Sequence, residues 1–470
     1  TSTYILLLMS RQPPKVLLAK QRASKNWTLI KKMTNKKRET FQNRFGFVLA
    51  CIGSAVGMGN IWLFPYRVGE GGGAAFLIPY FIFVFVLGFA GVAGEMAFGR
   101  AMKAGSIGAF RGASKMRGGR WGEFVGLVPT LGSLGIAIGY SVVVGWILKF
   151  LVGSVTGSLM KTKSEEYFGE ISASFGSIPW HLLGLVIVFA IMLFGIAKGI
   201  EKVNKFMMPA FFCLFLILAV RVFFLEGSAS GYSFLLKPKW SELGNVKTWV
   251  YALGQAFFSL SLAGSGTIVY GSYLKKDEDV IACARNVAIF DTLAALLSAF
   301  VILPAVFAFQ LDPNAGPALM FITMPKVFQQ MPAGTFFCIL FFVAVLFAAV
   351  TSLINLFETP VEAIQERFGV SRKIAVAIVA VVAVAVGVVI ESGDVVSTWM
   401  DVVSIYIIPL GALLAAIMFF WVCPPRFARE QVQMGREKKI GKWFEPMTKY
   451  IFVGLTIVVY ILGILYGGIG

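Results

Sequence analysis

The composition of this 470-residue chain excludes an ordinary soluble fold: 57% of its residues are apolar, 14% are charged, and the mean hydropathy is +0.79. Soluble domains carry about 25% charged residues. The net charge of +18 could indicate nucleic-acid binding, but the basic residues gather at the ends of apolar segments, so we expect no nucleic-acid partner.

Eleven apolar segments follow one another along the chain, each near the roughly 20 residues that a membrane-spanning helix needs. Because backbone groups in lipid must be paired within the structure, they predict one all-α integral membrane domain with eleven transmembrane helices, covering residues 33–470. Residues 1–32 lack the layout of a signal peptide, and we expect them to be an N-terminal extension from upstream or added sequence. The expected spans are 45–67, 75–98, 124–152, 179–198, 206–226, 248–272, 287–309, 334–358, 374–391, 397–422 and 449–466.

Lysine and arginine recur in alternate loops. They cluster before the first span and after the second, fourth, sixth, eighth and tenth, whereas the intervening loops contain fewer of them. Since cytoplasmic loops are the ones enriched in these residues, the N-terminus is predicted to be cytoplasmic. With eleven spans the C-terminus then lies outside, in a multi-pass protein of the cell (inner) membrane.

The first span contains a break in its helical pattern. Residues 53–60 read Gly-Ser-Ala-Val-Gly-Met-Gly-Asn, and the sixth span has a matching run at 259–267, Ser-Leu-Ser-Leu-Ala-Gly-Ser-Gly-Thr. Irregular backbone at membrane depth occurs where it lines a cavity, and paired broken helices are typical of transporter binding sites. Glycine-rich faces for helix packing are the alternative explanation. We predict a five-plus-five inverted repeat with helices one and six unwound mid-membrane.

Carboxylates inside the spans are costly and are usually functional or paired. Glu95 follows a glycine in the second span, where we expect it to brace irregular backbone. Asp291 lies in the seventh span and is better placed to bind a cation.

Several motifs resemble those of one transporter family. They are Gly-Asn-Ile-Trp-x-Phe-Pro-Tyr (59–66), Phe-Leu-Ile-Pro-Tyr (76–80), Gly-Glu-Met-Ala-Phe-Gly-Arg (94–100), Gln-Ala-Phe-Phe-Ser-Leu-Ser (255–261) and Tyr-Gly-Ser-Tyr (270–273). On these motifs, residues 37–466 resemble the neurotransmitter:sodium symporters, in particular their bacterial eleven-helix amino-acid transporters with the LeuT-type fold.

The resemblance implies two sodium sites built from hard oxygen ligands, including the carbonyls that unwound backbone exposes. The first would use Ala55, Asn60, Ser259 and Asp291. The second would use Gly53, Val56, Ala348, Thr351 and Ser352.

Chloride is expected not to be required. Chloride-dependent relatives resemble one another in carrying Asn where this chain has Asp291, and a Ser where it has Ala295. A fixed carboxylate beside sodium can balance the charge of the ion as chloride would.

The same resemblance implies a substrate site between the two breaks. A substrate carboxylate would lie against residues 57–59, where helix ends present partial positive charge, with a hydrogen bond from Tyr140. Gly57 lacks the acid of monoamine transporters, which favours an amino acid, and Gly264 lacks an aromatic lid, which leaves room for a large side chain. The implied residues are Ser54, Ala55, Met58, Gly59, Ile136, Tyr140, Phe258, Ser259, Ser261, Gly264, Ser352 and Leu356.

Gates and structural residues follow by position. On the cytoplasmic side Arg38 would pair with Glu366, near Phe41, Ser272 and Tyr273; on the outer side Leu63 replaces the family's Arg, and Asp401 remains. In the fifth span Gly199 and Pro209 resemble the family's unwinding motif, since proline removes a backbone hydrogen bond. Glu95 and Gln255 are assigned structural roles.

The function implied is sodium-coupled, chloride-independent import of a neutral, hydrophobic or aromatic amino acid by alternating access. The partners are the amino acid, sodium (two ions) and the lipid bilayer. We expect no enzyme activity, because no set of nucleophile and base or cofactor motif is found. A substrate-gated channel or a non-transporting sensor on the same scaffold is the alternative.

Overall fold

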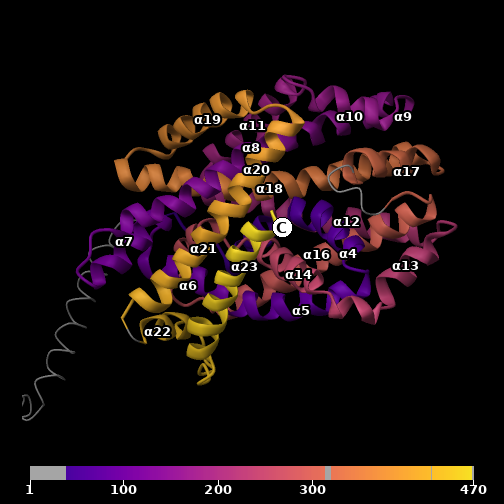
Figure 1. The fold of residues 1–470 in the computed structure, drawn as a ribbon. Coiled ribbons are helices and arrows are strands. Elements are labelled where there is room, and N and C mark those ends of the chain that lie inside the picture. The colour runs from indigo at the N-terminus through magenta and orange to yellow at the C-terminus, as the bar shows by residue number, and fades with distance from the viewer. Residues whose placement is uncertain (1–38, 313–318, 425, 468–470) are drawn as a thin grey trace, which may run out of the picture.

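The computed structural model describes residues 39–312, 319–424 and 426–467, and the regular elements in these ranges are all helical (Figure 1). The predicted extension 1–32 lies outside them. Within these described ranges, eight continuous helical runs are long and apolar enough to cross a membrane. They are Ala74–Met102 (α5 Ala74–Leu87, η2 Gly88–Val92, α6 Ala93–Met102), Gly122–Thr156 (α8), Ile196–Phe223 (η3 Ile196–Ile200, α12 Glu201–Phe223), Val280–Ala308 (α16), Gly334–Phe368 (α18), Arg372–Val389 (α19), Gly393–Val422 (α20 Gly393–Val402, η6 Val403–Ile407, α21 Ile408–Ile417, η7 Met418–Val422) and Pro446–Tyr466 (η8 Pro446–Phe452, α23 Val453–Tyr466).

The first predicted span is a bent pair of helices. α3 (Arg44–Ala55) is capped at its N-terminus by Asn43, whose side chain accepts a hydrogen bond from Gly46 N at 2.8 Å. It ends where Val56 turns extended, with φ −71° and ψ 109°. The chain resumes as a π-helical turn, η1 (Gly59–Leu63), and α4 (Phe64–Glu70), bent by 54° from α3.

The sixth predicted span is broken as well. α14 (Val246–Ser259) and α15 (Gly266–Ser272) are separated by residues 260–265, in which Ser261 and Gly264 have φ of 53° and 66°. With α11 (Ile178–Leu193) as a shorter apolar helix, each predicted span corresponds to helical structure. The count of eleven membrane crossings stays a prediction, since α11 and the broken sixth span are too short to qualify on length alone.

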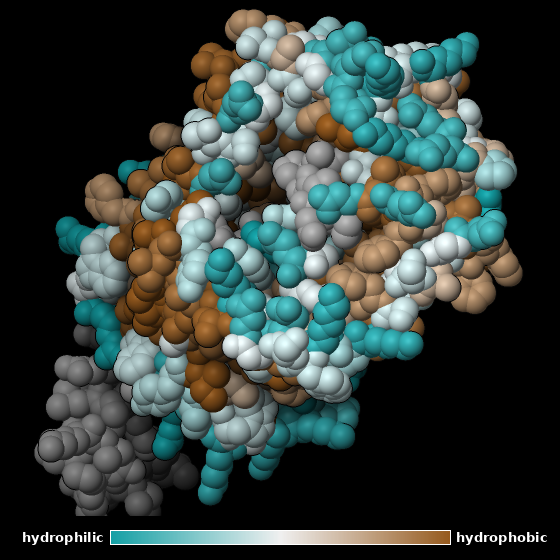
Figure 2. Space-filling view, turned by 45° about the vertical axis from the view of Figure 1, so that its right-hand side comes forward, coloured by the Kyte–Doolittle hydropathy of each residue, from teal (hydrophilic) through white to brown (hydrophobic). Residues whose placement is uncertain are grey.

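Short helices join the spans and gather at two opposite ends of the molecule (Figure 1). α7 (Ser106–Met116) and α22 (Phe427–Gln433) lie at one end. The other end carries α9 (Ser158–Lys161), α10 (Ser164–Ser172), α13 (Ser228–Leu236) and α17 (Met324–Gln330). The remaining turns are η4 (Trp240–Gly244) and η5 (Leu319–Thr323). Figure 2, with this second end turned forward, shows polar residues over the end and apolar residues along the flank, as a bilayer requires.

The long helices α8 and α18 form the centre, and α18 also packs against α3, α12 and α19. Where α6 meets α15, glycines bring the backbones together: a Cβ on Gly99 would stand 1.8 Å from the Ile268 carbonyl oxygen. Small residues allow such close approach between membrane helices. This frame encloses the two breaks.

Candidate substrate and ion site

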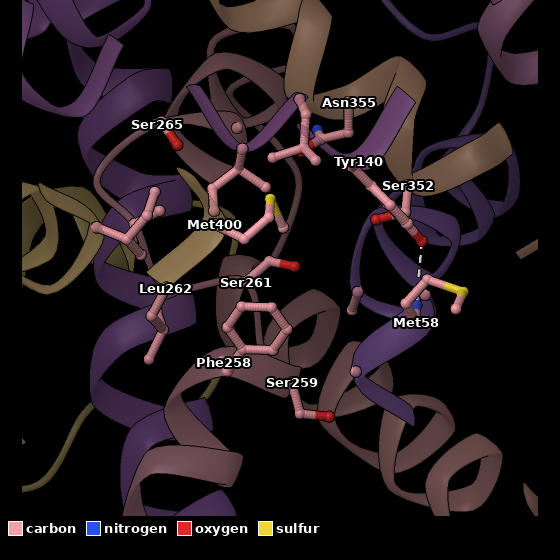
Figure 3. A pocket seen from close by; sticks show the side chains of 18 residues that line it. Met58, Tyr140, Phe258, Ser259, Ser261, Leu262, Ser265, Ser352, Asn355 and Met400 are labelled. Atoms are coloured by element: carbon pink, nitrogen blue, oxygen red, sulfur yellow. Dashed lines mark hydrogen bonds between the residues drawn. The ribbon is translucent and has the colours of Figure 1, made fainter. Parts of the chain in front are cut away.

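A cavity of about 110 Å³ lies between the two breaks, α8 and α18 (Figure 3). That volume is several times the ~10–15 Å³ that one water occupies on the same measure. Among the described residues that line it there is no lysine, arginine, aspartate or glutamate. The lining residues are Ala55, Gly57, Met58, Gly59, Ile136, Tyr140, Phe258, Ser259, Ser261, Leu262, Ala263, Ser265, Gly266, Ser352, Asn355, Leu356, Met400 and Ile408.

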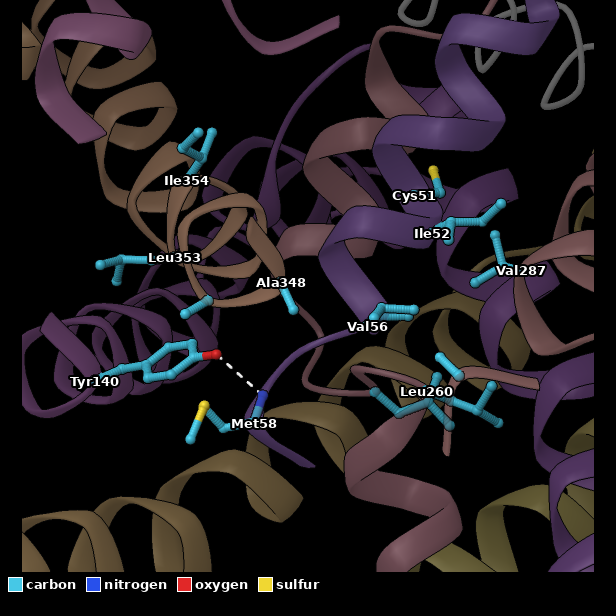
Figure 4. Packing of buried hydrophobic residues seen from close by; sticks show 14 of the residues in the cluster. Cys51, Ile52, Val56, Met58, Tyr140, Leu260, Val287, Ala348, Leu353 and Ile354 are labelled. Atoms are coloured by element: carbon cyan, nitrogen blue, oxygen red, sulfur yellow. Dashed lines mark hydrogen bonds between the residues drawn. The ribbon is translucent and has the colours of Figure 1, made fainter. Parts of the chain in front are cut away.

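One end of the cavity is polar. Met58 N donates to the Tyr140 hydroxyl at 3.0 Å (Figures 3 and 4). A Cβ on Gly57 would stand 2.9 Å from Ser352 Oγ and 3.2 Å from Tyr140 Oη. Residue 57 can therefore carry no side chain in this arrangement, and an aspartate there would need its neighbours to move. The hydroxyls of Tyr140 and Ser352 converge here beside the broken backbone, and the Gly57 and Met58 N–H groups are bonded to Asn60 Oδ1 and Tyr140 Oη. Hydroxyl groups at such a break are suited to a carboxylate.

The rest of the cavity is mostly apolar, with Ser259, Ser261, Ser265 and Asn355 as its other polar residues. Phe258 enters from α14, Ile136 from α8 and Leu356 from α18, while Met400 and Ile408 come from α20 and α21. A neutral apolar group fits such walls, whereas an unpaired charge there would lose its hydration.

Three residues of the predicted first sodium site meet beside the cavity. The Asn60 side-chain nitrogen is 2.7 Å from Asp291 Oδ1 and 3.1 Å from Ser259 Oγ, which itself donates to Asp291 Oδ2 at 2.8 Å. All three side chains are buried. Residues far apart in the sequence, on η1, α14 and α16, thus bring one carboxylate, one hydroxyl and one amide together, as the sequence predicts.

A second group lies where α18 faces the end of α3. Ser352 Oγ is 3.4 Å from the Ser54 carbonyl oxygen, and Thr351 Oγ1 donates to the Ala348 carbonyl at 3.1 Å. Figure 4 shows Val56 and Ala348 on the two facing elements. Gly53 lies close to the same part of α18, since a Cβ on Gly53 would be 3.0 Å from Thr351 Cβ. The first group contains one carboxylate, that of Asp291, and the second contains none. Within the described residues there is no cluster of three or more His, Cys, Asp or Glu side chains that could hold a metal ion.

Side chains from other helices hold both breaks. Gln255 Nε2 donates to the Gly59 carbonyl at 3.0 Å. The backbone N–H of Gly264 donates to Glu95 Oε1 at 2.8 Å, and Ser106 Oγ donates to the Gly264 carbonyl at 2.7 Å. Glu95 thus braces irregular backbone and lies away from the predicted ion ligands.

Two predicted substrate residues do not line the cavity. Ser54 contributes its carbonyl to Ser261 and Ser352 instead. Gly264 faces α21, where a Cβ would stand 2.4 Å from the Gly411 carbonyl oxygen. Its positive φ turns it away from the cavity, so the room expected from a missing aromatic at this position is filled by backbone.

The predicted cytoplasmic gate is an aromatic cluster over a buried ion pair. Phe41 packs edge-to-face on Tyr270 and Tyr273, with centroids 5.7 and 6.2 Å away. The Tyr273 hydroxyl donates to Glu358 Oε1 at 2.8 Å, and Arg372 holds both oxygens of that carboxylate at 2.8 and 2.6 Å.

The predicted ion pair of Arg38 with Glu366 stays a prediction, because Arg38 lies outside the described residues. Glu366 forms an ion pair with Arg111 of α7. Ser272 is buried and donates to the Val269 carbonyl at 2.6 Å.

On the opposite side, Leu63 is half-buried and Asp401 is exposed, with no ion pair to any other described residue. In the fifth span Gly199 lies in the π-helical turn η3, and Pro209 lies inside α12. The predicted unwinding segment is therefore helical in this structure.

A comparison with protein families assigns the chain to one of them. The model of the sodium:neurotransmitter symporter family matches residues 38–174 and 165–466. The chain belongs to that family. Its members are transporters and not enzymes.

Relatives agree with this membership. The sodium-dependent transporter YhdH of Bacillus subtilis is 37% identical over 331 residues, 69% of this chain and 72% of the relative. The transporter MJ1319 of Methanocaldococcus jannaschii is 30% identical over 91% of both chains. The crystal structure of MhsT in complex with L-phenylalanine superposes with a TM-score of 0.81 at 32% identity, covering 91% of this chain and 100% of MhsT.

Some residues of this symporter site escape prediction from the sequence. Met400, Ile408 and Asn355 line the cavity, and Asn204 lies beside Gly53. Asn355 is a buried amide inside the predicted eighth span, which is a usable signal. Asn204 precedes the predicted fifth span, and neither it nor Met400 and Ile408 give such a signal.

Proposed function

We propose that this chain is a sodium-coupled symporter that imports a neutral amino acid with a large apolar or aromatic side chain. The observation that carries the proposal is the two-part cavity, with the Tyr140 and Ser352 hydroxyls beside residues 57–59 and uncharged, mostly apolar walls elsewhere. An α-carboxylate matches the polar end, and no acid lies at position 57 to pair with the amine of a monoamine. The L-phenylalanine bound by MhsT has this chemistry.

The coupling follows from shared residues. Ala55 and Ser259 belong to both the cavity wall and the predicted first sodium site, and Ser352 belongs to both the wall and the predicted second site. Sodium bound at these positions fixes the broken backbone that contacts the substrate, so ion binding lowers the entropy cost of substrate binding. Alternating access then carries ion and substrate together.

Asp291 supports chloride independence. The carboxylate is buried among Asn60 and Ser259, and Ala295, also buried and one helical turn further along α16, has no hydroxyl to offer an anion. A resident negative charge beside sodium removes the need for a mobile one.

The orientation follows from charge. The end formed by α7 and α22 carries the basic loops, and we assign it to the cytoplasm of a cell with this protein in its plasma membrane.

Uptake into proteoliposomes tests the proposal. Twenty amino acids, dopamine and serotonin are each offered with an inward sodium gradient, with equal sodium on both sides, and with potassium alone. Accumulation of Phe, Tyr, Trp or Leu above the outside concentration, lost when the gradient is collapsed, is expected. Uptake that never exceeds equilibration indicates a channel, binding without uptake indicates a sensor, and preference for glycine, proline or a monoamine overturns the substrate class.

A further inference from the structure

A buried amide in α12 lacks a partner for its oxygen. Asn204 is completely buried, and its side-chain nitrogen donates to the Ile200 carbonyl at 2.8 Å. Within the described residues its Oδ1 accepts no hydrogen bond. A buried polar atom left unpaired costs about 1–3 kcal/mol, so such an atom calls for an explanation.

The unpaired oxygen points at the predicted second sodium site. A Cβ on Gly53 would stand 1.9 Å from Asn204 Oδ1 and 3.0 Å from Thr351 Cβ. Asn204 Oδ1 therefore lies against the Gly53 backbone, on the side that Thr351 approaches from α18. The helix α12 packs against both α3 and α18 along this seam.

We infer that Asn204 Oδ1 is a further ligand of the ion bound between Gly53 and Thr351, an inference that rests on the proposed function. Hard cations take neutral carbonyl and amide oxygens as ligands. The bond from Asn204 Nδ2 to Ile200 fixes which end of the amide faces the ion. The site thereby gains a ligand from a third helix in addition to α3 and α18.

Sodium-induced thermal stabilisation of the purified full chain tests the inference. Asn204→Leu keeps the size and removes the oxygen; Asn204→Asp restores an oxygen. We expect wild type and Asn204→Asp to gain melting temperature with sodium. For Asn204→Leu the half-maximal sodium concentration should rise about tenfold, the effect of losing roughly 1.4 kcal/mol of ion binding. Cys213→Ala, on an exposed part of α12, is the matched control and should behave as wild type.

The outcomes separate the two proposals. If wild type shows neither sodium-dependent stabilisation nor sodium-dependent uptake, the proposed function fails. If wild type responds and Asn204→Leu responds at the same sodium concentration, the ligand role of Asn204 is wrong while the symporter stands. If Asn204→Leu does not fold, Asn204→Ala takes its place with the same expected shift.

Discussion

The Asp291 carboxylate holds the Asn60 amide at 2.7 Å and the Ser259 hydroxyl at 2.8 Å, using one oxygen for each. This buried group carries the only formal charge of the predicted first ion site. Under the proposed coupling, this carboxylate balances the charge of the bound sodium.

Replacing external chloride with gluconate should leave sodium-driven uptake by wild type unchanged. Asp291→Asn removes the negative charge while keeping the shape, so its uptake should be abolished or become dependent on chloride. Uptake measured in paired chloride and gluconate buffers checks both expectations. A large loss in gluconate for wild type would contradict the assignment.

Gly57→Ala should weaken substrate binding by roughly 10- to 100-fold, the effect of displacing a binding group by about 1 Å. The added Cβ would meet Ser352 Oγ at 2.9 Å and shift the polar end of the cavity. Competition binding of labelled substrate measures the change. Gly454→Ala is the control, because a Cβ there meets no atom within 4 Å; equal affinity in both variants would refute the arrangement.

Gly264→Ala should reduce stability and leave substrate preference unchanged. The left-handed conformation costs an alanine about 1–2 kcal/mol, and the Cβ would stand 2.4 Å from the Gly411 carbonyl oxygen. Gly369→Ala measures the cost of the left-handed conformation without the steric clash, since Gly369 has φ of 68° and open space around it. Melting temperatures report the loss of stability, and the ratio of Phe to Leu uptake reports substrate preference. A changed ratio in a variant of unchanged stability would show that Gly264 belongs to the substrate site.

Arg372→Met should destabilise the protein by about 3–5 kcal/mol, because it leaves the Glu358 carboxylate buried and unpaired. The double variant Glu358→Gln/Arg372→Met removes both charges and should recover most of that loss. A thermal double-mutant cycle measures the recovery. Additive losses would show that the two residues act independently.

The Arg429–Glu445 pair should add stability that depends on pH. The hydrogen bond from Arg429 holds the pKa of Glu445 below its usual range. A lowered carboxyl pKa contributes stability above the unfolded value of about 4.3, and this is lost as pH falls through the folded pKa. The pair is about one-third exposed, so the effect should stay under about 1 kcal/mol. Glu445→Gln should lower the melting temperature at pH 7, with the difference from wild type closing below pH ~4; a constant difference would exclude the linkage.

The sequence allows the two breaks to be predicted because glycines and polar residues are unusual in a helix within lipid, whereas the set of ion ligands is what the family resemblance implies. Asn60 and Asp291 are costly there unless they meet, and the structure brings them together. The outcome at Gly264 was not predictable in the same way. Whether a glycine opens a cavity or admits a neighbouring backbone depends on its φ and on Gly411, which is distant in the sequence. Met400 likewise resembles any other apolar residue of its span until α20 is placed against the cavity.

The brace from Gln255 to Gly59 has a mechanical consequence. It ties the second half of the first span to the first half of the sixth, while close backbone contact ties α15 to α6. The continuous run Ala74–Met102 packs on both halves of the sixth span, α5 on α14 and α6 on α15, so it bridges that break. Residues 56–58 and 260–265, which lie between the half-helices, are the places where a dihedral change disturbs the hydrogen bonds within the half-helices least.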